Sequence, residues 1–149
     1  ETILPQIQSA CPRAVFRVVG AQPTPEVLAL KKIPGVDVTG SVPDVRPYLA
    51  QAAVVVAPLR IARGIQNKVL EGLSAARPVV ATPNALDGIG ATVGRDVLVA
   101  DDSADFARAV IDVLQGRAPA DMAANGRRYV VDHHQWSAQN AKLDTLLAG

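Results

Sequence analysis

The middle of the chain carries a segment whose residue types and spacing could bind a phosphate group: Gly64-Ile65-Gln66-Asn67-Lys68-Val69-Leu70-Glu71-Gly72-Leu73. It lies between two β-branched segments, 53–59 and 77–82, so the pattern predicts a strand, a helix opened by Gly64 and a second strand. The start of a helix presents unpaired N–H groups and the positive end of the dipole, which suits a phosphate. The carboxylate of Glu71 is expected about 9–10 Å along the helix axis, at roughly 1.5 Å per residue, where it could accept hydrogen bonds from two ribose hydroxyls.

The same helix is expected to be amphipathic. At 100° per residue its apolar face is formed by Ile65, Val69, Leu73 and Ala76. The opposite, polar face carries Asn67, Lys68 and Glu71. Two interpretations of the polar face remain open: a solvated surface with an i,i+3 pair between Lys68 and Glu71, or a binding site for a phosphate and a ribose.

The elements that must position this segment alternate along the chain. Strands are predicted at 14–19, 36–39, 53–57, 79–81 and 97–100. Helices are predicted at 2–9, 24–32, 44–51, 65–76, 103–115, 121–133 and 137–147, with capping residues at Thr24, Asp44 and Ser103. This alternation predicts an α/β fold: a Rossmann-like, mostly parallel sheet with helices on both faces and a C-terminal helical tail.

Composition narrows the class of protein. The 149 residues suffice for one domain, 1–149, and Val and Ala dominate a chain with only 3% aromatic residues, as is typical of a parallel sheet covered by helices. A net charge of +1 gives no electrostatic case for binding nucleic acid. Cys11 is the single cysteine, which excludes a disulfide framework and favours a reducing compartment. No stretch approaches the roughly 18 apolar residues of a membrane span, and no signal peptide is visible.

The central motif resembles that of a known family. The pattern Gly64-Ile65, Leu70-Glu71-Gly72-Leu73, Ala75 and Pro78-Val79-Val80-Ala81 is similar to the C-terminal half of group 1 (family 4) glycosyltransferases of the GT-B fold. The turn Gly40-Ser41-Val42, the segment 96–100 and the helix led by Trp136 resemble further family features in the same order, over about 14–147. The segment 58–68 resembles that of sugar transferases linked to bacterial exopolysaccharide systems.

The resemblance implies a site for a nucleotide-sugar donor, as a substrate and with no cofactor or metal. The expected donor-binding residues are Gly20, Gly40, Ser41, Val42, Arg63, Gly64, Ile65, Gln66, Asn67, Lys68 and Glu71. The family often carries two acids eight positions apart; Glu71 matches the second, which contacts the ribose, whereas Arg63 occupies the position of the first. No catalytic residue is therefore assigned, and Arg60 and Arg63 are candidates for contact with phosphate or an anionic acceptor.

The family also implies parts that these residues lack. It places a basic pair near the first strand of this domain, and no strand before Thr2 could carry that pair. We therefore expect a fragment lacking its first strand: the donor-binding half of a bacterial, cytoplasmic enzyme, inactive alone, that transfers a sugar with retention. The glycan or lipid-linked acceptor would bind through an N-terminal domain, and the resemblance leaves room for peripheral association with the inner face of the membrane.

The remaining polar and glycine positions have simpler interpretations. Gly88, Gly90 and Gly94 fit turn geometry and no phosphate-binding fingerprint. Asp101 and Asp102 are expected to support the start of the next helix, and His133 and His134 lie near a helix end, where a positive charge suits the dipole. Trp136 is expected to be a packing anchor.

Two other functions are left open by the sequence. Arg63 in place of an acid is compatible with a non-catalytic nucleotide-binding or protein-interaction module. A receiver-like signalling domain would also alternate strands and helices, but it needs an acidic pocket where Gly20 and Gly40 stand.

Overall fold

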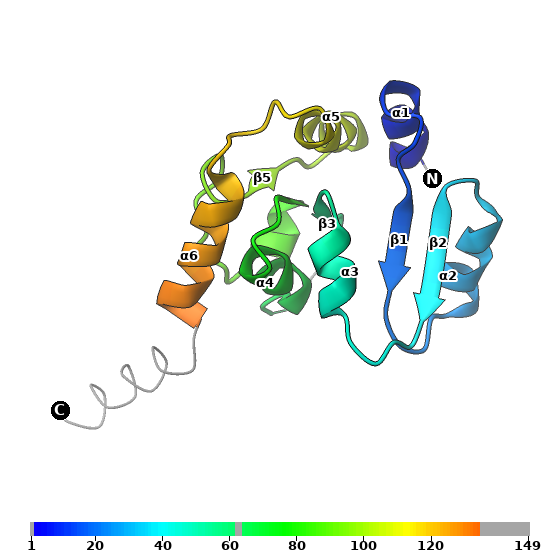
Figure 1. Ribbon diagram of the computed structural model, residues 1–149, viewed down its shortest axis with the longest axis horizontal. Helices are drawn as coiled ribbons and strands as arrows, with labels where there is room; N and C mark the ends of the chain where they lie inside the picture. The colour runs from blue at the N-terminus through cyan, green and yellow to red at the C-terminus, as the bar shows by residue number, and fades with distance from the viewer. Residues whose placement is uncertain (1, 62–63, 135–149) are drawn as a thin grey trace.

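The computed structural model describes residues 2–61 and 64–134, in which helices and strands alternate (Figure 1). The strands are β1 (Phe16–Val19), β2 (Val36–Gly40), β3 (Val55–Ala57), β4 (Val79–Ala81) and β5 (Leu98–Val99). The α-helices are α1 (Ile3–Ala10), α2 (Pro25–Ala29), α3 (Arg46–Gln51), α4 (Asn67–Ser74), α5 (Ser103–Leu114) and α6 (Met122–His134). Short 3₁₀ helices follow α2 and β4, at Leu30–Lys32 (η1) and Pro83–Leu86 (η2).

All pairs between these strands are parallel, so the predicted α/β fold with parallel strands is confirmed. Hydrogen bonding divides the described strands into a two-stranded sheet, β1–β2, and a three-stranded sheet, β3–β4–β5. In the second sheet Val55 pairs with Val79, and Val80 pairs with Leu98. The central strand β4 is fully buried, which explains its uninterrupted run of small and β-branched apolar residues.

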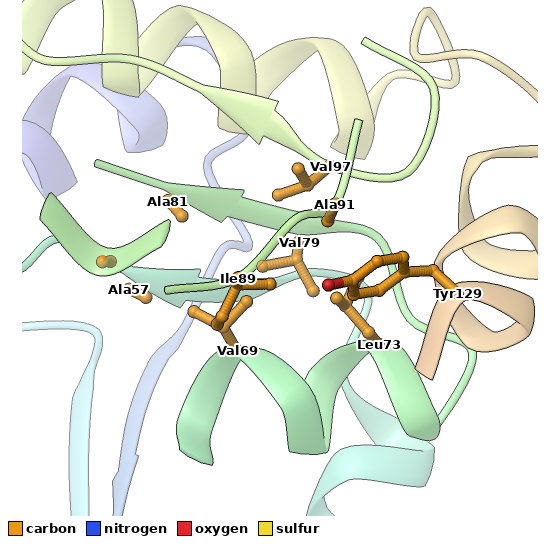
Figure 2. Close-up of a cluster of buried hydrophobic side chains, with 10 residues drawn as sticks. Ala57, Val69, Leu73, Val79, Ala81, Ile89, Ala91, Val97 and Tyr129 are labelled. Carbon is orange, nitrogen blue, oxygen red and sulfur yellow. The ribbon is translucent and has the colours of Figure 1, made fainter. Parts of the chain in front are cut away.

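Helices cover both faces of the three-stranded sheet, as predicted. Val79 and Ala81 belong to a core with Val69 and Leu73 of α4 and Tyr129 of α6, and Figure 2 shows these side chains converging between helices and strands. Val80 belongs to a second core beneath α1 and α5, with Ile7, Phe106 and Val110. Successive side chains of a strand point to opposite faces, so one short strand anchors both helical layers.

Two helix glycines allow the layer containing α4 and α6 to pack closely. A Cβ atom at Gly72 of α4 would lie 2.9 Å from Val79 Cγ2 and 3.0 Å from Val55 Cγ1. A Cβ atom at Gly126 of α6 would lie 2.6 Å from Leu73 Cδ2. Helix α4 is therefore held tightly between the sheet and α6, which determines where its first turn lies.

The helix boundaries agree only in part with the predictions. Thr24 caps α2 as predicted, because its hydroxyl accepts a hydrogen bond from the N–H of Val27. The predicted cap at Ser103 is wrong: Asp102 caps α5, and its carboxylate accepts a 2.8 Å bond from the N–H of Asp105. The predicted cap at Asp44 is also displaced, because Val45 precedes α3, although Asp44 accepts a 2.9 Å bond from the N–H of Arg46.

The C-terminal helix α6 confirms part of the predicted helical tail. The helix predicted at 137–147 and its leading Trp136 lie outside the described residues. Within residues 2–61 and 64–134, no helix has the length and apolar character needed to cross a lipid bilayer.

Candidate functional site

The start of α4 differs from the prediction by two residues. Helix α4 begins at Asn67 instead of Ile65, because Gly64 has a left-handed backbone (φ +71°) and Gln66 is extended (φ −86°, ψ 102°). The side-chain amide of Gln66 donates a 3.0 Å bond to the carbonyl of Gly64, which closes this turn. Ile65, predicted to join the apolar face, is half-exposed (50%), whereas Val69 and Leu73 are buried as predicted. The prediction that Ala76 extends the helix is also wrong, since α4 ends at Ser74.

The first turn of α4 offers backbone donors. The N–H groups of Val69 and Leu70 donate to the carbonyl of Gln66 at 3.0 and 3.4 Å. No acceptor among the described residues bonds the N–H of Asn67 or Lys68, and no side chain caps the helix. These two N–H groups lie at the positive end of the helix dipole, so the site can bind an anion.

Glu71 projects from the same helix and is exposed. It lies four residues beyond Asn67, so it is about 6 Å along the axis, nearer to the helix start than the sequence predicted. In the described part of the chain its carboxylate forms no ion pair, including none with Lys68. The predicted i,i+3 pair between Lys68 and Glu71 is therefore absent, while both side chains are exposed. A solvated surface and a binding site remain the two interpretations of the polar face.

The loop between β3 and α4 is held by residues that the sequence analysis did not single out. The hydroxyl of Thr82, directly after β4, donates a 2.6 Å bond to the carbonyl of Leu59. The side-chain amide of Asn84 donates a 2.5 Å bond to the carbonyl of Arg60. Polar residues immediately after a predicted strand are the signal that could have identified both, since the carboxyl ends of parallel neighbouring strands lie at one edge.

A shallow hollow of about 300 Å³ adjoins this loop and is lined by Pro83, Asn84, Leu86, Asp87 and Gly88. The predicted turn role of Gly88 and Gly94 is confirmed, because both have left-handed backbones. A Cβ atom at Gly88 would lie 3.3 Å from Cγ1 of Ile65. The loop that carries Gly88, Gly90 and Gly94, here called the glycine loop, therefore packs beside Ile65, two residues before α4. The glycine loop therefore lies beside the segment that leads into the start of α4.

Other predicted site residues lie at the ends of β1 and β2. Gly20 follows β1, and its N–H donates a 3.4 Å bond to the carbonyl of Gly40, the left-handed last residue of β2. A Cβ atom at Gly20, Gly40 or Gly64 would meet no atom within 4 Å among the described residues, so each faces open space. Ser41 is exposed and Val42 is half-buried in the turn after β2. Arg63 lies outside the described residues.

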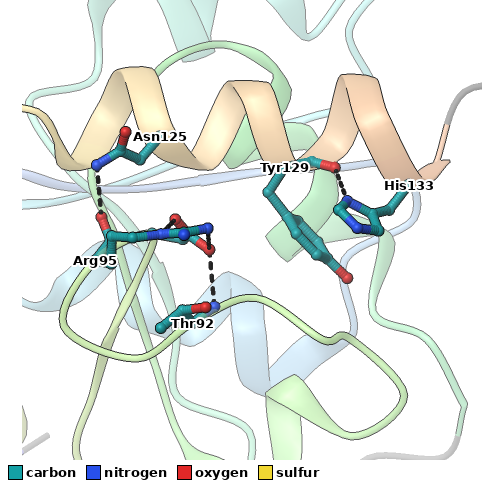
Figure 3. A network of polar contacts seen from close by, with 6 residues as sticks. Thr92, Arg95, Asn125, Tyr129 and His133 are labelled. Atoms are coloured by element: carbon teal, nitrogen blue, oxygen red, sulfur yellow. Dashed lines mark hydrogen bonds and ion pairs between the residues drawn. The ribbon is translucent and has the colours of Figure 1, made fainter.

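A polar network fastens α6 to the glycine loop. Figure 3 shows Asn125 of α6 reaching the carbonyl of Arg95, while His133 bonds the carbonyl of Tyr129 in its own helix. The hydroxyl of Tyr129 accepts a 2.7 Å bond from the N–H of Gly90, and Nδ1 of His133 donates a 2.9 Å bond to the carbonyl of Tyr129. These contacts give His133 a structural role at the helix end, and they fix the loop that adjoins Ile65.

The buried Asp96 completes this network. Its carboxylate accepts bonds from Nε of Arg95 at 2.7 Å and from the N–H of Thr92 at 2.8 Å. The hydrogen-bonded guanidinium of Arg95 lowers the pKa of Asp96 below its ordinary value. Hydrogen bonding to the N–H of Asp105 likewise lowers the pKa of Asp102 at the start of α5. The described residues contain no group of three or more His, Cys, Asp or Glu side chains that could hold a metal ion.

Comparison with known proteins identifies relatives. A family model described as "Glycosyl transferases group 1" matches residues 1–116, which is most of the chain. No curated protein matches the chain.

Solved structures of three proteins share the fold, and each match covers nearly the whole of this chain. One is Anabaena Alr3699/HepE in complex with UDP, with a TM-score of 0.75 and 15% sequence identity; the match covers 99% of this chain and 44% of the HepE chain. HepE in complex with UDP-glucose gives a TM-score of 0.73. A glycosyltransferase from Rickettsia africae ESF-5 has a TM-score of 0.75 at 12% identity, covering 97% of this chain and 42% of its own. AviGT4, a glycosyltransferase involved in avilamycin A biosynthesis, has a TM-score of 0.62 at 23% identity, covering 99% of this chain and 48% of its own. The chain thus has the fold of part of a GT-B glycosyltransferase and spans less than half the length of these proteins.

Proposed function

This chain belongs to the group 1 glycosyl transferases, and from that premise we propose that residues 1–149 form the donor-binding half of a sugar-transferring enzyme. The donor is a nucleotide sugar, the acceptor is a glycan or a lipid-linked glycan bound mainly by another domain, and the sugar is transferred with retention. The half represented by 1–149 is inactive alone. The lone Cys11 supports a reducing, cytoplasmic location.

The observation that carries the proposal is the arrangement of donors and an acceptor on α4. The N–H groups of Asn67 and Lys68 can bind the diphosphate, and the cationic side chain of Lys68 adds to the positive dipole end. Glu71, with no partner among the described side chains, can accept hydrogen bonds from the ribose one turn away. Support also comes from HepE, which has this fold and has been solved with UDP and UDP-glucose.

The remaining predicted residues complete the proposed site. Gly40, Ser41 and Val42 border the base, Gly20 allows close approach of the nucleotide, and Gly64, Ile65 and Gln66 lead into the helix start. In this scheme the helix start stabilises negative charge that develops on the leaving diphosphate. No cofactor takes part.

Calorimetry with UDP and 2′,3′-dideoxy-UDP on the full-length protein tests the role of Glu71. A hydrogen bond to a charged group contributes about 1.5–3 kcal/mol, so Glu71→Ala should weaken UDP binding roughly 10- to 100-fold. The same substitution should change the affinity for dideoxy-UDP by less than about twofold, because that ligand lacks the hydroxyls that Glu71 would bind.

Ser74→Ala is the matched control, since Ser74 is exposed on the same helix and, among the described residues, its hydroxyl bonds only the carbonyl of Glu71. This variant should bind UDP as the wild type does. Equal weakening of UDP and dideoxy-UDP by Glu71→Ala would remove the ribose role. Absence of binding to UDP-, GDP- and ADP-sugars in the full-length protein would sink the proposed function.

A non-catalytic nucleotide-binding module is the second candidate, and Arg63 at the position of the family's first acid favours it. Turnover of a nucleotide sugar by the full-length protein with a lipid-linked glycan acceptor separates the two. Donor binding without turnover on any acceptor would favour the module.

A further inference from the structure

The hollow beside the loop after β3 carries one carboxylate that has no partner among the described residues. Its volume is about 300 Å³, and Asp87 is the charged residue among those that line it: Pro83, Asn84, Leu86, Asp87 and Gly88. Asp87 is exposed, and in the described part of the chain it forms no ion pair. Its two oxygens can therefore accept up to about four hydrogen bonds from a ligand.

The backbone that carries Asp87 is held on both sides of this residue. Ile89 is buried in the core that also contains Val69 of α4, and Figure 2 shows these two side chains together. On the other side, the side-chain amide of Asn84 donates a 2.5 Å bond to the carbonyl of Arg60. The N–H of Asp87 itself donates a 3.3 Å bond to the carbonyl of Asn84. Asp87 is thus an exposed side chain on a loop fastened both to α4 and to the loop after β3.

This loop places Asp87 beside the segment that leads into α4. Gly88 is the next residue, and a Cβ atom there would lie 3.3 Å from Cγ1 of Ile65. Ile65 stands two residues before Asn67, the first residue of α4, whereas Glu71 stands four residues after it. One exposed carboxylate therefore lies within the helix and the other beside the approach to it. A diphosphate bound at the helix start would have an acid on each side.

The lining of the hollow has the chemistry of a surface that binds a neutral sugar. The carboxylate of Asp87 and the side-chain carbonyl of Asn84 are acceptors for hydroxyl groups. Pro83 and Leu86 offer apolar surface to the carbon-bound hydrogens of a sugar ring. The charge of Asp87 would repel an anionic sugar. The volume lies at the lower end of the range of small-molecule sites, about 300–1,000 Å³.

We propose that this hollow binds the sugar of the nucleotide-sugar donor, and that Asp87 accepts hydrogen bonds from the hydroxyl groups of that sugar. The inference rests on the proposed function, because a diphosphate at the start of α4 is what brings the sugar to the hollow. Glu71 then contacts the ribose at one end of the diphosphate, and Asp87 contacts the sugar at the other end. Asp87 contributes to the affinity for the sugar and not to the affinity for the nucleotide.

The charge of Asp87 acts in opposite directions on the two parts of the donor. A carboxylate near the diphosphate repels it, so loss of the charge leaves the affinity for the nucleoside diphosphate unchanged or slightly raised. Loss of a hydrogen bond to a charged group weakens sugar binding about 10-fold or more. A purely structural role would weaken both ligands, because it would displace the loop that packs beside Ile65.

Calorimetry on the full-length protein tests this role of Asp87. Among UDP-glucose, UDP-galactose, GDP-mannose and ADP-glucose, the ligand that binds most tightly is compared with its own nucleoside diphosphate. Asp87→Asn should weaken binding of that nucleotide sugar at least about 10-fold, and it should weaken binding of the diphosphate by less than about twofold.

Asp101→Asn is the matched control. Asp101 is also an exposed acid, and it follows β5 at the same edge of the sheet that carries β4. This variant should bind both ligands as the wild type does. Because both carboxylates are exposed, both variants should keep the melting temperature of the wild type.

Three results would overturn the inference: equal weakening of the nucleotide sugar and its diphosphate by Asp87→Asn, unchanged affinity for both, or an equal effect of Asp101→Asn on the nucleotide sugar. Failure of the wild-type protein to bind any nucleotide sugar would remove the proposed function and this inference with it. Binding that Asp87→Asn leaves unchanged would remove this inference alone, so the two failures are distinguishable.

Discussion

Replacing Gly72 by alanine should destabilise the fold, although alanine is the better helix former. Gly72 lies in α4 where the helix meets the sheet, and an added Cβ would lie 2.9 Å from Val79 Cγ2 and 3.0 Å from Val55 Cγ1. The contact at 2.9 Å is shorter than Cβ atoms tolerate, and the one at 3.0 Å is at that limit. One of the three elements must shift, and the helix start shifts with α4.

The size of the effect follows from two opposing terms. Alanine favours a helix interior over glycine by about 1 kcal/mol, whereas overpacking a core costs about 1–3 kcal/mol. Val79 has no exposed surface, and both valines are β-branched and stiff at χ1, so they cannot rotate away. The packing cost should therefore lie in the upper part of its range, about 2–3 kcal/mol. The net loss is then about 1–2 kcal/mol, and the melting temperature should fall by roughly 2–8 °C.

Urea unfolding followed by circular dichroism, on Gly72→Ala, Val79→Ala and the double variant, isolates the cause. If the overlap with Val79 is responsible, the double variant should lose less free energy of unfolding than the sum of the single losses, by about 1 kcal/mol. A Gly72→Ala variant as stable as the wild type, or additive losses in the double variant, would refute the packing argument.

Three further predictions concern the site and its supports. Gly20→Ala should leave the melting temperature unchanged or slightly raised, because the new Cβ meets no described atom within 4 Å. The same substitution should weaken UDP binding, and an unchanged affinity for UDP would show that Gly20 is not part of the site. Thr82→Val removes the 2.6 Å hydrogen bond to the carbonyl of Leu59. Urea titration should show a free energy of unfolding lower by about 1–2 kcal/mol, and calorimetry should show weaker UDP binding. In the folded state the hydrogen bond from Arg95 lowers the pKa of Asp96 below 3.8, its ordinary value. The Asp96 carboxylate therefore contributes to the stability of the fold at a pH above 3.8, and this contribution is lost as the pH falls through the lower pKa of the folded state. Asp96→Asn should therefore lose less stability than the wild type between pH 7 and pH 3, and identical pH profiles would contradict this assignment.

The central helix shows how far the sequence could predict the candidate site. The spacing of Val69 and Leu73 identified the buried face of α4, because burial of one face imposes the helical period on the sequence. The same spacing placed the helix start at Ile65, two residues too early. Periodicity cannot register that Gly64 adopts a left-handed backbone or that Gln66 is extended, since both depend on how the loop after β3 is held.

The sequence by itself determined the class of fold, since each short apolar run became a parallel strand and each amphipathic stretch between them became a helix. These signals are local, because backbone hydrogen bonding and one-sided burial act within a single element. Only the tertiary structure decided how the loop between β3 and α4 is held, since Thr82 and Asn84 donate hydrogen bonds to carbonyls 23 and 24 residues earlier in the chain. It also decided how the described strands pair, as a sheet of β1 and β2 and a sheet of β3, β4 and β5, because strand pairing depends on which elements lie side by side in space.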